Sequence, residues 1–174
     1  MRLFRSLILL LTLVAPTAFA DSLYQVEMIL FRQLGEPAAT LQFAPEDWSA
    51  GAKRIDSSNE RSPALNDMAK KLQDSGKYQV LLQKAWQQNI GTENSKMAVT
   101  SGQEQLGHFP VEGTISLAIA RFTDVSADFW INQLDPHGIL ISSEHMKQTA
   151  RVKNGELIYL DNSNLAVLIK VSPL

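Results

Sequence analysis

The alternation of apolar and polar residues between positions 113 and 131 most restricts what this chain of 174 residues can fold into. A period of two places alternate side chains on one face of a β-strand. So long a register exceeds the usual strand of about 5–6 residues, which predicts a long bent strand or a bulge near Thr123 and Asp124. The apolar side chains stand at odd positions: Ile115, Leu117, Ile119, Val125, Phe129 and Ile131.

Arg121 lies on the apolar side of this pattern, near its middle. A guanidinium that is removed from water must be paired with an acid or with hydrogen-bond acceptors. We therefore expect Arg121 to be a buried, paired charge with a structural or functional role.

A second β signal is the pair Asn154-Gly155 between two apolar runs, which predicts a hairpin over residues 145–160. A two-residue turn would fix the register and place one set of side chains on the core side: Ala150, Val152, Leu157 and Tyr159. Lys147, Arg151 and Lys153 would then project together from the other side. This basic ridge is interpreted either as a solvated strand face or as a surface that binds an anionic ligand.

Further strands are predicted over residues 24–31, 78–86 and 165–171, and one helix over residues 62–76. Ser62 is the expected helix cap, Pro63 suits the first turn and Gly76 suits the exit. Residues 34–61, which include Trp48, and residues 87–110 are polar and are predicted to be long loops, the second with a weak hairpin as the alternative. The predicted fold class is α+β, with a mostly antiparallel sheet, one main helix and long polar loops.

Residues 1–20 have the three zones of a secretory signal peptide: Arg2 and Arg5, an apolar stretch, and the small residues Ala18 and Ala20. We expect cleavage after Ala20 and a single domain over residues 21–174 in the periplasm. The chain has no cysteine, so neither a disulfide nor a lipid anchor is expected. Without the first 20 residues, 14 basic residues stand against 18 acidic ones, which argues against nucleic acid as a partner. No further segment is long and apolar enough to predict membrane insertion.

No arrangement of residues predicts catalysis. The histidines His108, His137 and His145 lack the spacing of a metal site, so neither a metal nor another cofactor is expected. No nucleophile motif is present. A glycosidase would need two carboxylates across a cleft, and the sequence does not pair the candidates: Glu46, Asp47, Asp124, Asp128 and Asp135. Trp48 is interpreted as an anchor over the core or as a platform for a sugar ring.

Four blocks of the sequence, in this order, resemble the CsiV family of periplasmic peptidoglycan-binding proteins of gammaproteobacteria. The blocks cover most of residues 21–174: "YQVEMILFRQ", "KYQVLLQKAWQQN", "GTISLAIARFTDV" and "ARVKNGELIYLDNSNLAVLIKVSP". The resemblance implies a non-enzymatic accessory protein that binds peptidoglycan and supports cell-wall synthesis. It also implies a protein partner, a lipoprotein activator of a bifunctional penicillin-binding protein.

Two other functions remain open at this point. One is a wall-cleaving glycosidase with an unrecognised carboxylate pair, and the other is a periplasmic module that binds protein alone. On the binding hypothesis, the candidate ligand-binding residues are Lys147, Arg151, Lys153 and Trp48.

Overall fold

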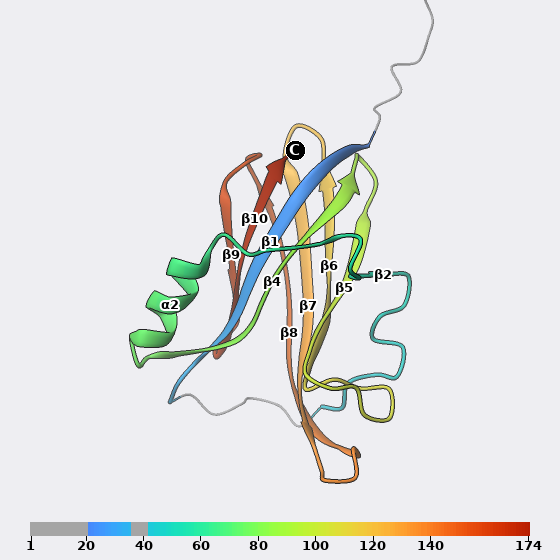
Figure 1. The fold of residues 1–174 in the computed structure, drawn as a ribbon, viewed down its shortest axis with the longest axis vertical. Helices are drawn as coiled ribbons and strands as arrows, with labels where there is room; N and C mark the ends of the chain where they lie inside the picture. The colour runs from blue at the N-terminus through green and yellow to red at the C-terminus, as the bar shows by residue number, and fades with distance from the viewer. Residues whose placement is uncertain (1–20, 36–41) are drawn as a thin grey trace, which may run out of the picture.

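The computed structural model describes residues 21–35 and 42–174, and these residues form two five-stranded sheets (Figure 1). The first sheet has the strand order β3 (Glu60–Arg61), β4 (Tyr78–Ile90), β1 (Ser22–Gln33), β10 (Leu165–Pro173) and β9 (Leu157–Asp161). The second sheet has the strand order β2 (Lys53–Arg54), β5 (Ser95–Ser101), β6 (Val111–Ile119), β7 (Thr123–Leu134) and β8 (Leu140–Val152). Among the strand pairs described, only β2 and β5 run parallel.

The inward faces of the two sheets share one hydrophobic core. It contains side chains from all the long strands, and the largest fully buried ones include Met28, Leu30, Trp86, Ile115, Leu117, Phe129 and Met146. Burial of apolar surface is the main stabilising contribution to such a fold. Because one face of each strand is committed to the core, the opposite face of the second sheet is left for polar side chains.

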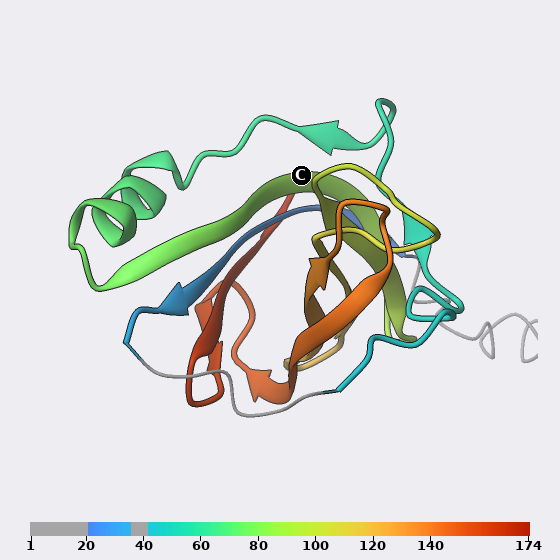
Figure 2. The ribbon, with the colours of Figure 1, turned by 90° about the horizontal axis from the view of Figure 1, so that it is seen from below.

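The helix α2 (Asn66–Asp74) covers the outer face of the first sheet (Figure 2). Its apolar stripe, predicted from the sequence, packs against Ile29 and Phe31 of β1; the stripe consists of Leu65, Met68, Ala69 and Leu72. β1 is therefore apolar on both faces, as its sequence indicates. α2 has nine residues, and over residues 21–35 and 42–174 no helix is long and apolar enough to cross a bilayer.

The helix begins later than the sequence predicts. Ser62 and Pro63 precede it, and Leu65 stands at the N-cap position without a side-chain cap. The carboxylate of Glu27 accepts a hydrogen bond from the backbone N–H of Leu65 at 2.5 Å, so a residue of the sheet replaces the local cap. Gly76 follows the helix with φ +67°, as expected for its exit.

The predicted long strand over residues 113–131 is a hairpin of β6 and β7. The two strands are joined by Ala120, Arg121 and Phe122, and Ile119 pairs with Thr123. A connection of three residues pairs odd positions with odd positions, so the apolar register continues unchanged through the turn. The alternation alone therefore cannot distinguish one long strand from this hairpin.

Arg121 is exposed at this turn, so the prediction of a buried, paired Arg121 is wrong. Its guanidinium carbon lies 5.7 Å from the centre of the Phe122 ring, and no ion pair involves it among the described residues. Arg121 stands at an odd position, as the core residues do, but it lies in the turn and is therefore not buried. Arg32 of β1 has the properties expected of Arg121, because it is three-quarters buried and forms an ion pair with Glu144 of β8.

The predicted hairpin over residues 145–160 is also wrong, although its turn is present. Lys153 accepts a hydrogen bond from the N–H of Glu156, and Gly155 has φ +81°. Leu106 is the only described non-glycine residue with positive φ, so Asn154 lacks the conformation that a type I′ hairpin turn requires. The chain passes at this turn from the second sheet to the first: β8 pairs with β7, and β9 pairs with β10.

This crossover inverts the predicted facing of β9. Ile158 and Leu160 enter the core because they pair with Ile169 and Val167 of β10, whereas Leu157 and Tyr159 are exposed. The face of β9 is set by its neighbour in the first sheet and not by the turn that precedes it.

The stretches predicted to be loops contain strands. Residues 87–110 hold the end of β4 and all of β5, and the described part of residues 34–61 holds the short strands β2 and β3. The prediction of a mostly antiparallel arrangement with one helix is confirmed, with two sheets in place of one and a smaller helical part than the α+β class suggests. The predicted signal peptide, residues 1–20, lies outside the described residues.

Asn154 holds the crossover turn against the β6–β7 turn, and its removal should destabilise the fold. Its Oδ1 accepts a hydrogen bond from Thr123 Oγ1 at 2.9 Å, and its Nδ2 donates to the carbonyl of Ala120 at 3.2 Å. Asn154→Ala leaves the buried Thr123 hydroxyl without this partner, so we expect a loss of about 2–3 kcal/mol in the free energy of unfolding. Urea unfolding measures this loss as a lower midpoint at an unchanged slope.

Two variants at exposed turn positions serve as controls for Asn154→Ala. Ser163→Ala alters the β9–β10 turn, and Arg121→Ala alters the β6–β7 turn itself. Each should change the free energy of unfolding by no more than about 1 kcal/mol. An Asn154→Ala protein as stable as these controls would contradict the stabilising role of Asn154.

Candidate functional site

An open groove of about 870 Å³ lies on the second sheet. It lies on the outer face of that sheet, the face turned away from the shared core. Its lining comes from β5, β6, β7, β8 and two connecting segments: Gly51, Asn94, Lys96, Thr114, Ser116, Asp124, Val125, Ser126, Asp128, Lys147, Thr149, Ala150 and Arg151.

The strand register explains why this groove is polar. Positions of β6 and β7 that alternate with the core residues face outward, and β8 adds the residues that pair with them. Ser126 pairs with Ser116 on one side and with Thr149 on the other, which gives a row of three hydroxyls across the sheet. Hydroxyls both donate and accept hydrogen bonds, so this row suits a polar ligand.

An ion pair stands at each end of the β7–β8 part of the groove. Arg151 donates to both carboxylate oxygens of Asp124, from Nε at 2.5 Å and from Nη2 at 2.9 Å. Four residues along β7, Asp128 Oδ2 lies 3.1 Å from the ammonium of Lys147. Arg151 and Lys147 are each opposed by an acid directly across the strands, whereas Lys96, the third cation of the lining, pairs with Ser116. The groove thus carries charges of both signs.

The pKa of the Asp124 carboxyl is lowered, chiefly by the hydrogen bond from Arg151, and the pKa of Arg151 is raised by the same contact. A carboxyl with a depressed folded-state pKa stabilises the fold above its ordinary pKa of 3.8 and loses that contribution as the pH falls through the depressed value. Both charges of this pair are therefore present at neutral and mildly acidic pH.

Trp130 lies on the same outer face, beside the groove. Its ring stacks on His145 with centroids 3.7 Å apart and planes at 10°. His145 Nε2 in turn lies 2.8 Å from Asp128 Oδ1. The stack thus positions the carboxylate that faces Lys147.

The segment that begins at residue 42 packs over the outer face of the second sheet, next to Ser143 of β8. The N–H of Ser143 donates to the carbonyl of Gln42, and the N–H of Ala44 donates to Ser143 Oγ at 3.1 Å. Lys96 reaches the same segment, because its ammonium donates to the carbonyl of Ala50 at 2.9 Å. These contacts place Gly51 at the groove.

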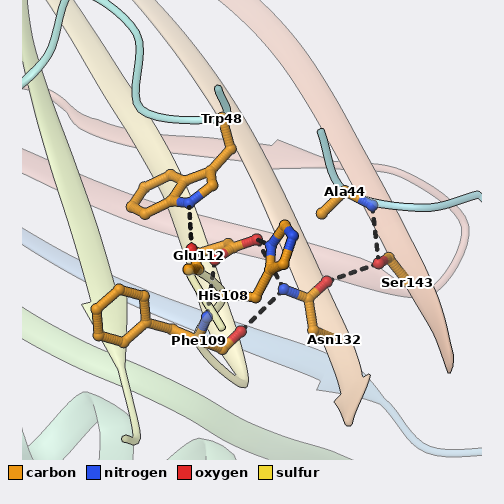
Figure 3. A network of polar contacts seen from close by, with 8 residues as sticks. Ala44, Trp48, His108, Phe109, Glu112, Asn132 and Ser143 are labelled. Atoms are coloured by element: carbon orange, nitrogen blue, oxygen red, sulfur yellow. Dashed lines mark hydrogen bonds and ion pairs between the residues drawn. The ribbon is translucent and has the colours of Figure 1, made fainter. Parts of the chain in front are cut away.

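A buried carboxylate supports this end of the sheet (Figure 3). Glu112 is fully buried and contacts His108 Nδ1 at 2.7 Å. It also accepts hydrogen bonds from the Phe109 N–H at 2.8 Å and from Asn132 Nδ2 at 2.8 Å. Asn132 Oδ1 accepts from Ser143 Oγ at 2.6 Å, so this Glu112 network extends to the segment that carries Ala44.

The four predicted ligand-binding residues lie in different places. Lys147 and Arg151 share the groove, as the basic ridge predicts. Lys153 lies beyond the end of β8 and does not line the groove. Trp48 packs edge-on against Phe109 with centroids 6.1 Å apart, and its N–H donates to the carbonyl of Gly107 at 3.4 Å. This packing agrees with the anchor interpretation of Trp48.

Sequence reasoning missed the acids and hydroxyls that accompany Lys147 and Arg151. Asp124 and Asp128 were considered only as catalytic carboxylates or solvated residues, and the hydroxyl row was not recognised. The signal was present for both acids and for two of the three hydroxyls, because they stand at polar positions of the 113–131 alternation; Thr149 lies outside it. Only the pairing of β7 with β8 shows which cation meets which acid.

The fold and the groove together define a small β-sheet protein with an open polar groove on the outer face of its second sheet. A family model described as "Peptidoglycan-binding protein, CsiV" matches residues 2–62 and 52–174. The chain therefore belongs to the CsiV family of peptidoglycan-binding proteins, and the resemblance of the four sequence blocks is confirmed. No curated protein and no solved structure matches the chain significantly.

The Glu112 network should be essential for the stability of this end of the second sheet. Glu112→Gln replaces one of the two acceptor oxygens with a donor, which faces the donor of either Phe109 or Asn132, so we expect a loss of about 2–3 kcal/mol. The exposed Glu104 lies in the same connection, and Glu104→Gln is the matched control. Urea unfolding measures both variants, and equal midpoints would contradict the prediction.

Proposed function

We propose that this protein is a non-enzymatic periplasmic accessory protein that binds peptidoglycan in the groove of the second sheet and supports cell-wall synthesis. Membership of the CsiV family supports peptidoglycan as the ligand. The observation that carries the choice of site is the groove itself, because it is wide, open and lined by charged and hydroxyl side chains. An open groove can bind the middle of a polymer chain, whereas an enclosed cavity can admit only the free end of such a chain.

The separation of Asp124 and Asp128, and the lowered pKa of Asp124, favour binding over glycosidic cleavage. Their α-carbons are separated by four strand residues, or about 13 Å, and each carboxylate is held by a different cation. A glycosidase requires an acid with a raised pKa close to a second carboxylate. The pKa of Asp124 is lowered instead. Incubation with purified sacculi tests this, and release of muropeptides above a heat-inactivated sample would contradict the proposal.

The periplasm is the compartment in which peptidoglycan is accessible, and the predicted cleavage after Ala20 would deliver the protein there. The intact mass of the protein recovered from the periplasm tests both the location and the cleavage after Ala20. A lipoprotein activator of a bifunctional penicillin-binding protein is the protein partner that we propose from the family resemblance. Binding to protein-free sacculi separates this accessory function from a module that binds protein alone.

Removal of the groove cations should weaken binding to sacculi. In the double variant Lys147→Ser, Arg151→Ser, the groove loses two of its three cations, so we expect at least about a tenfold weaker affinity in sedimentation with purified sacculi. The matched control is Lys70→Ser, Lys71→Ser, which makes the same change of charge on α2, on the other side of the first sheet.

Circular dichroism of both proteins first establishes that they are folded. If both variants bound sacculi as tightly as the unsubstituted protein, the wall-binding surface would lie elsewhere. Equal but weakened binding would show that net charge alone, and not the groove, attracts the protein to the wall. The affinity should also fall as salt rises, since exposed charges are screened within about 10 Å at 0.1 M.

A further inference from the structure

We propose that the groove binds the stem peptide of peptidoglycan and not its glycan strand. This inference rests on the proposed function and names the part of the polymer that the site recognises. It depends on three features of the outer face, namely the absence of a free aromatic platform in the groove, the alternation of charges, and the unequal exposure of cations and acids.

No aromatic side chain lines the groove. Sugar-binding sites present flat aromatic rings, since the apolar face of a sugar packs on them. The three tryptophans of this chain have other contacts: Trp86 is buried in the core, Trp48 packs on Phe109, and one face of Trp130 is covered by His145. The groove therefore lacks the element on which recognition of a glycan usually depends.

The polar groups follow an order that matches a charged peptide. Along β7 and β8 the groove presents the Asp124–Arg151 pair, then Ser126 opposite Thr149, then the Asp128–Lys147 pair. The two charged pairs are about 13 Å apart, which is the distance that four residues of an extended chain cover. An extended peptide lying along these strands can thus bring charged groups to both pairs.

The two components of the wall polymer differ in charge. The sugars of the glycan strand carry hydroxyl and acetamido groups and no net charge while the lactyl group is amide-linked to the stem peptide. An amidase that removes the peptide leaves this lactyl carboxylate on the glycan, so the denuded glycan differs from the intact polymer by the peptide and not by a loss of all negative charge. The stem peptides carry carboxylates, and a diamino acid that is not cross-linked adds an ammonium group. A groove with cations and anions in register complements the peptide and offers no counterpart to a neutral sugar chain.

The cations of the groove are the more accessible members of their pairs. The side chain of Lys147 is 64% exposed and that of Arg151 is 69% exposed, against 28% for Asp128 and 46% for Asp124. Asp124 occupies Nε and Nη2 of Arg151, which leaves Nη1 and the second Nη2 hydrogen for a ligand. The acids orient the cations, and the cations can bind carboxylates of the peptide at little cost because exposed ion pairs are weak.

Sacculi from which an amidase has removed the stem peptides provide the direct test. The full-length mature protein is sedimented with intact sacculi and with the denuded glycan, at equal mass of glycan. We expect at least a tenfold loss of binding to the denuded glycan. Equal binding to both materials would overturn the inference and leave the proposed function intact, whereas no binding to intact sacculi would overturn both.

Competition with soluble peptides tests the role of the carboxylates. The probe is the free wall tetrapeptide, and the matched control is the same tetrapeptide with its carboxylates converted to amides. The free tetrapeptide should displace the protein from intact sacculi, and the amidated form should require at least a tenfold higher concentration. Equal displacement by the two peptides, or by neither, would overturn the inference.

A single substitution tests whether the tetrapeptide binds in this groove. Arg151→Gln keeps a polar side chain and removes the bidentate cation, so it should reduce the difference between the free and the amidated tetrapeptide. Lys71→Gln on α2 makes the same change of charge away from the groove and should retain the full difference. If Arg151→Gln also retained the full difference, the peptide would bind elsewhere, and the assignment to this groove would be wrong.

Discussion

The packing of the two sheets against each other is the constraint on which the rest of the structure depends. Each long strand must turn one face toward the shared core, where Trp86, Phe129 and Met146 are fully buried. Because side chains alternate along a strand, this commitment also fixes what the other face presents. The polar groove on the second sheet is a direct consequence of the apolar face behind it, and a shift of one residue in β7 would exchange the two.

Polar contacts connect the strands and turns at three places outside the hydrophobic core. The Glu112 network ties the connection before β6 to β7 and β8, and Asn154 joins the two turns at the opposite end. Between them, the ion pair of Arg32 with Glu144 links β1 of the first sheet to β8 of the second. Such groups are stabilising only when their hydrogen bonds are made, so they specify one arrangement of the connections.

Two of the three cations of the groove are balanced by acids of the protein, and this decides what kind of recognition the site can perform. A bare row of cations would attract any anionic surface through its net potential. Here Asp124 and Asp128 offset Arg151 and Lys147, and Lys96 alone remains as an excess cation of the lining. Attraction at long range is therefore small, and the arrangement of individual donors and acceptors matters more. The site is therefore better suited to discrimination between components of the wall than to adhesion to negative charge in general.

The sequence by itself determined the strand periodicity, the apolar stripe of α2, the outward placement of Lys147 and Arg151, and the family. The periodicity, the stripe and the outward placement follow from local repeats, because a period of two or of 3.6 residues assigns each side chain to a face. The family follows from the resemblance of four sequence blocks. The sequence could not distinguish a long strand from the β6–β7 hairpin, since a three-residue turn preserves parity, and so Arg121 was assigned to the core. It could not show that the chain changes sheets at Asn154-Gly155, since a turn does not specify its strand partners. Those partners, and with them the burial of Ile158 and the pairing of Asp124 with Arg151, were decided only in the tertiary structure, by the packing of segments distant in sequence.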